Sequence, residues 1–163
     1  MDIFLHNTLS NNKEKFTPIK DGVVKMYNCG PTVYGPQHIG NLSMFVFTDV
    51  LRRTLENGGY NVNQVINFTD FGHLVSDGDL GDDKMTKGLK REGVELNLPN
   101  MLSLGSKYAN IFLNDIKELN IDTTKINFPF ASKYIDQQIK VIETLEQKGF
   151  TYKTTDGIYF DTT

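Results

Sequence analysis

The sequence predicts an α/β fold, and three consecutive segments support this prediction. Residues 22–29 alternate apolar and polar side chains and include the β-branched pair Val23-Val24, which favours a strand. A segment with helical apolar spacing follows, and residues 62–68 have the composition of a second strand. Residues 22–68 therefore form a predicted βαβ unit, whose connection has the length that a right-handed parallel crossover needs.

Glycine and proline mark the ends of the first loop and the first helix. Gly30-Pro31 ends the first strand, and Gly58-Gly59 stops the helix. The apolar residues with helical spacing between these points are Leu42, Phe45, Val46, Val50, Leu51 and Leu55. This pattern predicts a helix that carries the chain back to the start of the second strand.

Residues 69–83 are irregular and acidic, with four aspartates between positions 77 and 83. Such a run is most often a solvated loop. A calcium loop that starts at Asp77 is rejected, because its pattern needs glycine where Asp82 stands and glutamate where Gly88 stands.

Three helices are expected next, over residues 84–92, 99–119 and 132–148. Pro99 stands at an allowed first-turn position. The third helix has the clearest pattern, with Ser132 as its cap and Gly149 at its end. Its apolar stripe consists of Ile135, Ile139, Ile142 and Leu145. We interpret residues 84–148 as a helical insertion.

The last predicted element is a β-hairpin over residues 150–163, with its turn at Asp156-Gly157. Up to this point the pattern indicates only two strands of the parallel sheet, whereas a doubly wound sheet usually has about five or more. We therefore expect an incomplete sheet.

Composition excludes several classes of protein. At 163 residues the chain fits one domain, and 39% hydrophobic with 23% charged residues excludes a disordered or collagen-like chain. The longest apolar stretch is far below the ~18 residues of a membrane span, and the N-terminus does not resemble a signal peptide. We expect a cytoplasmic protein without a membrane partner.

Two counts limit the ligands that the chain can bind. A single cysteine, Cys29, excludes an internal disulfide and any zinc site of this chain alone that needs two or more thiolates. A net charge of -3 provides no general attraction for nucleic acid, so any RNA contact must be local.

The informative residues gather where the first strand meets the first helix. Ligands bind at this carboxyl end of a strand in α/β sheets, and a helix N-terminus presents free N–H groups to phosphate. His38 lies at or just before the helix start, and Gly40 leaves room for adenine or ribose against the backbone. The location suits a nucleotide, although a lone histidine is more often a structural donor. The sequence contains neither GxGxxG nor GxxxxGK[ST], which argues against Rossmann dehydrogenases and P-loop enzymes.

Four pieces of sequence carry a more specific signal. They are Met26-Tyr27-Asn28-Cys29-Gly30-Pro31-Thr32-Val33-Tyr34, His38-Ile39-Gly40-Asn41, Phe47-Thr48-Asp49-Val50-Leu51-Arg52-Arg53 and Asn67-Phe68-Thr69-Asp70. In order and spacing they resemble the N-terminal part of the catalytic domain of cysteinyl-tRNA synthetases, and the resemblance covers essentially the whole chain. It implies a Rossmann-like class I synthetase domain that activates L-cysteine with ATP and transfers it to tRNA(Cys).

The resemblance implies how the substrate cysteine is bound. Cys29 matches the first ligand of a zinc ion (Zn2+) that also takes the substrate thiolate, which selects cysteine over serine. Without the resemblance, a single cysteine at a strand end is more often core packing. Gly30, Thr32 and Thr69 match residues beside the substrate, and for Thr69 a simple turn hydroxyl is an equal alternative.

The resemblance also implies how ATP is bound. His38, Gly40 and Asn41 match the HIGH signature, which stabilises charge on the phosphates of ATP bound with Mg2+. Asn41 replaces the final histidine of that signature, and its amide can still donate a hydrogen bond.

The chain departs from the commoner family pattern at two places. Residues 71–81 are an insertion that brings His73, which we interpret as a loop residue. The other zinc ligands and the KMSKS loop are expected beyond residue 163, so we expect the chain alone to be inactive. Lys84-Met85-Thr86-Lys87-Gly88 imitates that loop, but it precedes the helical insertion, and we interpret it as a coincidence.

We therefore expect residues 1–163 to be the N-terminal part of one catalytic domain, in a monomeric enzyme. Within it, residues 22–70 carry the nucleotide and amino acid site, 84–148 the helical segment and 150–163 the hairpin. Two alternatives stay open. One is a ligase that joins cysteine to an amino sugar, as in mycothiol synthesis, and the other is a non-catalytic nucleotide-binding module.

Overall fold

The computed structural model describes residues 2–71 and 84–162. The chain begins with an antiparallel hairpin of β1 (Phe4–Asn7) and β2 (Asn12–Lys15), which sequence analysis did not predict. Asn11 has a φ of 56° at the turn, a conformation that asparagine tolerates better than most residues.

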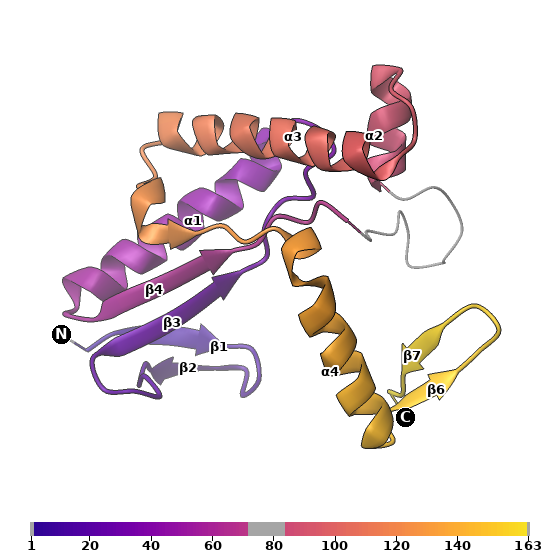
Figure 1. Ribbon diagram of the computed structural model, residues 1–163. Helices are drawn as coiled ribbons and strands as arrows, with labels where there is room; N and C mark the ends of the chain where they lie inside the picture. The colour runs from indigo at the N-terminus through magenta and orange to yellow at the C-terminus, as the bar shows by residue number, and fades with distance from the viewer. Residues whose placement is uncertain (1, 72–83, 163) are drawn as a thin grey trace.

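The centre of the fold is a parallel sheet in the order β3-β4-β5 (Figure 1). β3 (Val23–Asn28) pairs in parallel with β4 (Asn61–Ile66), and α1 (Ile39–Asn57) connects them. This arrangement confirms the predicted α/β class and its βαβ unit. The two-residue strand β5 (Ile126–Asn127) adds a third parallel strand, where sequence analysis indicated only two.

The predicted helices are present, and β5 lies between the second and the third of them. They are α2 (Lys84–Glu92), α3 (Leu98–Glu118) and α4 (Ile135–Gln147). Short 3-10 turns at Thr123–Lys125 and Ala131–Tyr134 flank β5. Figure 1 shows α4 extending away from the sheet, with the predicted hairpin of β6 (Thr151–Lys153) and β7 (Ile158–Phe160) at its far end.

The predicted capping role of Ser132 is wrong. The residue before α4 is Tyr134, and no side chain caps the helix there. Ser132 instead donates from its backbone N–H, at 2.9 Å, and from its hydroxyl, at 2.5 Å, to the carboxylate of Asp70. Asp70 is buried, and these bonds attach the segment before α4 to the chain that follows β4.

The main core lies where α1 and α3 pack against the sheet. Phe112 of α3 makes edge contacts with Phe45 of α1, at 4.7 Å between ring centroids, and with Phe68 after β4, at 5.7 Å. All three rings are buried, and burying side chains of this size is a large hydrophobic contribution to stability. The core therefore fixes the loops that follow β3 and β4.

One of the four family-like pieces has a structural explanation. Arg52 is 1% exposed, and its guanidinium bonds to the carboxylates of Asp49 and Glu56 on the same helix. Arg53 bonds to Asp49 at 2.6 Å and to the backbone oxygen of Asn120 after α3, also at 2.6 Å. A buried arginine is costly unless it is paired, so this piece holds α1 in place.

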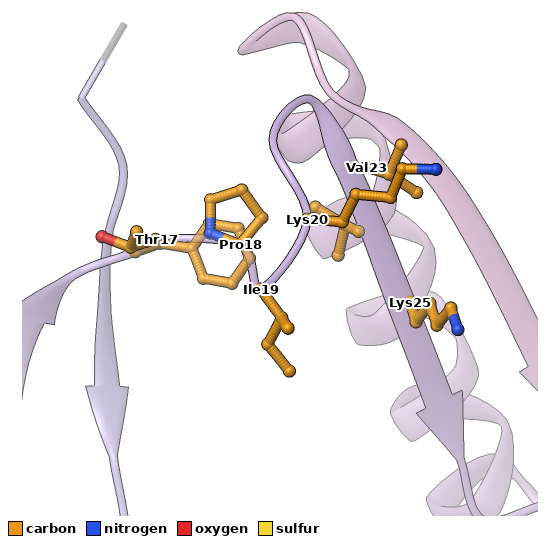
Figure 2. A pocket seen from close by; sticks show the side chains of 8 residues that line it. Thr17, Pro18, Ile19, Lys20, Val23 and Lys25 are labelled. Atoms are coloured by element: carbon orange, nitrogen blue, oxygen red, sulfur yellow. The ribbon is translucent and has the colours of Figure 1, made fainter.

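A small pocket of about 280 Å3 lies beside the amino-terminal half of β3 (Figure 2). The segment from Phe16 to Lys20 lines it together with Val23, Val24 and Lys25. Because the strand runs from Val23 to Asn28, this pocket is remote from the carboxyl end where sequence analysis places the site. In the part of the chain that the structure describes, no helix has both the length and the apolar character to cross a membrane.

Candidate functional site

A second pocket, of about 600 Å3, lies at the carboxyl end of β3 and the start of α1. It is lined by six of the seven predicted site residues, namely Cys29, Gly30, Thr32, His38, Gly40 and Asn41. The seventh, Thr69, does not line it. Proximity places these residues in one site, and their individual roles stay predictions.

His38 is the N-cap of α1, as its predicted position requires. Its backbone is extended, and its Nδ1 accepts a hydrogen bond from the N–H of Gly40 at 3.1 Å. Because Nδ1 is an acceptor, the proton of the neutral imidazole is on Nε2. The exposed ring therefore has one N–H with which to donate to a ligand.

The close contact between position 40 and the His38 ring favours glycine at this position, which the sequence did not reveal. A Cβ at this position would stand 3.0 Å from Cε1 and 3.1 Å from Nδ1 of His38. Any larger residue would thus require the imidazole to shift by a few tenths of an ångström. Asn41 is exposed in the same first helical turn, which contains no acidic residue. The turn therefore keeps its positive potential for an anion.

The ends of β3 and β4 touch at Gly30 and Asn67. A Cβ on Gly30 would lie 1.5 Å from the backbone oxygen of Asn67, a clash that only glycine avoids. The N–H of Gly30 donates to Oδ1 of Asn67 at 2.9 Å. The backbone of the Cys29-Gly30 turn is thus held by the neighbouring strand.

Thr69 is connected to the segment that lines the pocket by backbone hydrogen bonds. The N–H of Thr69 donates to the oxygen of Pro31 at 3.0 Å, and the N–H of Val33 donates to the oxygen of Thr69 at 3.1 Å. These bonds continue the parallel pairing beyond the strands, through a bridge between Thr32 and Thr69. Nδ2 of Asn67 donates to the Thr69 hydroxyl at 3.1 Å.

Asn67 was not among the predicted site residues, although it contacts two of them. Its carboxamide contacts both Gly30 and Thr69, so one side chain connects two predicted substrate contacts. The available signal was its place, directly after a predicted strand and two residues before Thr69. A polar residue at the carboxyl end of a parallel strand is a candidate by position alone.

Cys29 is a free, exposed cysteine, so the alternative that it serves as core packing is wrong. A thiolate there suits a soft metal such as zinc. Within residues 2–71 and 84–162, no group of three histidine, cysteine or acidic side chains is placed to hold a metal ion. Cys29 therefore fits one ligand position of a zinc site, and the described residues do not supply the others.

The structure also places Lys84 at this pocket, although the sequence around it was interpreted as a coincidental imitation of KMSKS. Lys84 begins α2 and is half-buried, whereas Lys87, the other lysine of that imitation, is exposed and does not line the pocket. His73 and the four aspartates of the acidic segment lie outside the described residues.

Known proteins resemble this chain in sequence and in fold. Residues 15–163 match the family model described as tRNA synthetases class I (C) catalytic domain. A cysteine-tRNA ligase 1 from Burkholderia lata is 46% identical over 162 residues, covering 99% of this chain and 33% of that protein. A cysteine-tRNA ligase from Pyrococcus horikoshii is 38% identical over 161 residues, covering 99% of this chain and 30% of that protein.

The chain spans about a third of the length of these curated relatives. A solved structure described as an arginyl-tRNA synthetase from Campylobacter jejuni has a TM-score of 0.58 and 17% identity to this chain. The match covers 86% of this chain and 38% of that one, and it shows a shared fold.

Proposed function

Because the chain belongs to the family of class I (C) tRNA synthetase catalytic domains, we propose that it is the N-terminal part of a cysteine-tRNA ligase. The proposed enzyme activates L-cysteine with ATP and transfers it to tRNA(Cys). The observation that supports this proposal is that one pocket is lined by Cys29 and also by His38, Gly40 and Asn41. Cys29 offers a thiol that could bind a metal beside the substrate cysteine. His38 and Asn41 offer hydrogen-bond donors for phosphate.

The first reaction needs stabilisation of negative charge. An oxygen of the cysteine carboxylate attacks the α-phosphorus of ATP, and the bond from that phosphorus to the bridging oxygen breaks. Pyrophosphate leaves with the bonding electron pair, and no proton moves. Negative charge grows on the phosphate oxygens, and donors already in place lower the barrier without reorganisation.

Three features of this chain can stabilise this charge. His38 offers its Nε2–H, because Nδ1 is occupied by Gly40. The N-terminus of α1 adds a partial positive charge, while the N–H groups of Gly40, Asn41 and Leu42 already donate to His38. We assign both to the α-phosphate and the leaving pyrophosphate, with Asn41 as a further donor.

The substrate cysteine is assigned to the other end of the pocket. Gly30 and Thr32 line it, and Thr69 is held against the same segment by backbone hydrogen bonds. Cys29 would hold a zinc ion together with ligands outside the described residues. Bound zinc would supply a preference for a thiolate over a hydroxyl. Mg2+ accompanies ATP in this proposal, and we place the enzyme in the cytoplasm as a monomer.

Transfer of labelled cysteine tests the proposal. The full-length protein, ATP and cysteine are incubated with tRNA, and in parallel with an amino sugar. Acid-precipitable cysteinyl-tRNA is the expected product. Cysteine joined to the amino sugar, or tight ATP binding without any transfer of cysteine, would contradict the proposal and favour one of the two alternatives.

A further inference from the structure

The pocket around His38 is also lined by a cationic residue, Lys84, to which the proposed function gives no role. Among its described lining residues, Lys84 is the one lysine or arginine, and there is no aspartate or glutamate. A pocket whose fixed charge is positive favours an anionic ligand. We propose that Lys84 binds the triphosphate of ATP, an inference that rests on the proposed function.

Packing of α2 holds Lys84 at the pocket. Lys84, Gly88 and Arg91 are spaced by four and then three residues, so they lie on one face of the helix. All three contact Tyr34, which also lines the pocket. The position of the lysine is therefore set by the loop that carries the nucleotide site.

The contacts to Tyr34 are close and of different kinds. The ammonium of Lys84 stands 5.9 Å from the centroid of the Tyr34 ring. A Cβ on Gly88 would lie 2.9 Å from the backbone oxygen of Tyr34, so a larger residue would separate α2 from the loop. Nη2 of Arg91 donates to the same oxygen at 2.5 Å.

The contact between Lys84 and Tyr34 is weak enough for the ammonium of Lys84 to leave it for a ligand. A ring at this distance attracts an ammonium only modestly. A phosphate attracts it more strongly, through a charge-assisted hydrogen bond. The Lys84 ammonium can therefore move from the Tyr34 ring to a phosphate oxygen when ATP enters the pocket.

Calorimetric titration of the full-length protein with ATP and Mg2+ tests the inference without the need for cysteine. Lys84→Met keeps an apolar chain over Tyr34 and removes the charge, and it should weaken ATP binding about 10- to 100-fold, the effect of losing one hydrogen bond to a charged group. Lys84→Arg should retain most of the affinity. Lys87→Met, on the exposed side of the same helix, is the matched control and should bind like wild type.

Adenosine, which has no phosphate, should bind equally to wild type and Lys84→Met. An equal loss of adenosine and ATP affinity in Lys84→Met would show that the lysine only shapes the pocket, and it would overturn the inference. Wild-type affinity for ATP in Lys84→Met would overturn it as well.

The test separates this inference from the proposed function. Weakened ATP binding in Lys84→Met supports the inference even where the wild-type protein transfers no cysteine. Normal cysteine transfer together with unchanged ATP binding in Lys84→Met rejects the inference and leaves the proposed function intact. A wild-type protein that binds no ATP contradicts both.

Discussion

Asn67 illustrates what a single residue can decide in this site. Its Nδ2 donates to the hydroxyl of Thr69, so the proton of that hydroxyl is free to donate elsewhere. Its Oδ1 meanwhile accepts from the N–H of Gly30. We therefore propose Asn67 as a positioning residue, which would act on the substrate through Thr69 and the Cys29-Gly30 turn.

Asn67→Asp keeps the acceptor for Gly30 and replaces the donor to Thr69 by a second acceptor. The Thr69 hydroxyl should then donate to the new carboxylate, and its proton is lost to the substrate. We expect the KM for cysteine to rise about threefold to tenfold, the effect of one neutral hydrogen bond. The rate of adenylate formation is measured while the concentration of cysteine, and then that of ATP, is varied. The KM for ATP should change little.

A double variant and a control sharpen this prediction. Thr69→Val should raise the KM for cysteine to a similar extent, and the double variant should be no worse than either, because both remove the same contact. Asn63→Asp, at an exposed position on β4, the strand that precedes Asn67, should leave the KM unchanged. Additive effects of Asn67→Asp and Thr69→Val would contradict the coupling.

The sequence predicted six of the residues that line the pocket, because these six lie close together along the chain. Cys29, Gly30 and Thr32 follow one strand, and His38 and Gly40 begin one helix. Asn67 and Lys84 contact the same region through chain segments that are distant in sequence, and no local pattern reveals such contacts.

Among the helices, Glu92 of α2 makes polar contacts with α3, in addition to the apolar packing between them. Its carboxylate accepts from Nζ of Lys107 at 2.5 Å and from the hydroxyl of Tyr108. The hydrogen bond from Lys107, followed by that from Tyr108, holds the pKa of Glu92 below its ordinary value. A carboxyl with a lowered pKa in the folded state stabilises that state above its ordinary pKa.

This contribution should disappear in acid. It is complete above the ordinary pKa of glutamate, about 4.3, and is lost as the pH falls through the lower value of the folded state. Glu92→Gln cannot titrate, so the melting temperature of wild type should exceed that of the variant at neutral pH and approach it in acid. A difference that stays constant from neutral to acid pH would contradict this role.

The sequence predicts a helix or strand only where the segment has a clear local pattern of apolar residues. α1 carries a long apolar period and ends at Gly58, and the predicted ends of α1 and α3 agree with the structure to within a few residues. β5 has only two residues, too few for any periodicity, and it forms because β4 offers a free edge. β2 reads Asn-Lys-Glu-Lys and is exposed throughout, so it has no apolar signal.

Ser132 failed as a predicted cap for a tertiary reason. A serine ahead of an apolar period is a sound capping signal in isolation. Asp70, distant in sequence, competes for both its N–H and its hydroxyl and is buried beside it. The bond to the charged partner prevails, and α4 begins later.

For the whole molecule, the zinc proposal makes the broadest prediction. A single thiolate does not hold zinc against water, whereas four ligands in tetrahedral geometry do. The full-length protein should contain about one zinc per chain, and the isolated 163-residue chain far less. Metal analysis of both purified proteins, after removal of loosely bound ions, measures this directly.

Cys29→Ser in the full-length protein tests the ligand role. The serine hydroxyl stays protonated at neutral pH, so zinc content and discrimination between cysteine and serine should fall together. Without the metal, the pocket distinguishes sulfur from oxygen mainly by size, which is worth only about 1–3 kcal/mol. A variant with full zinc and full discrimination would show that the exposed thiol has another role.

The central claim is that the pocket around His38 activates cysteine, and cysteine-dependent exchange of pyrophosphate into ATP by the full-length protein tests it most directly. Wild type should exchange with cysteine and far more slowly with serine. His38→Asn keeps an acceptor for the N–H of Gly40 but lacks Nε2–H, so exchange should fall about 100-fold at an unchanged melting temperature. Exchange that requires a different amino acid, or a His38→Asn rate within about threefold of wild type, would contradict the claim.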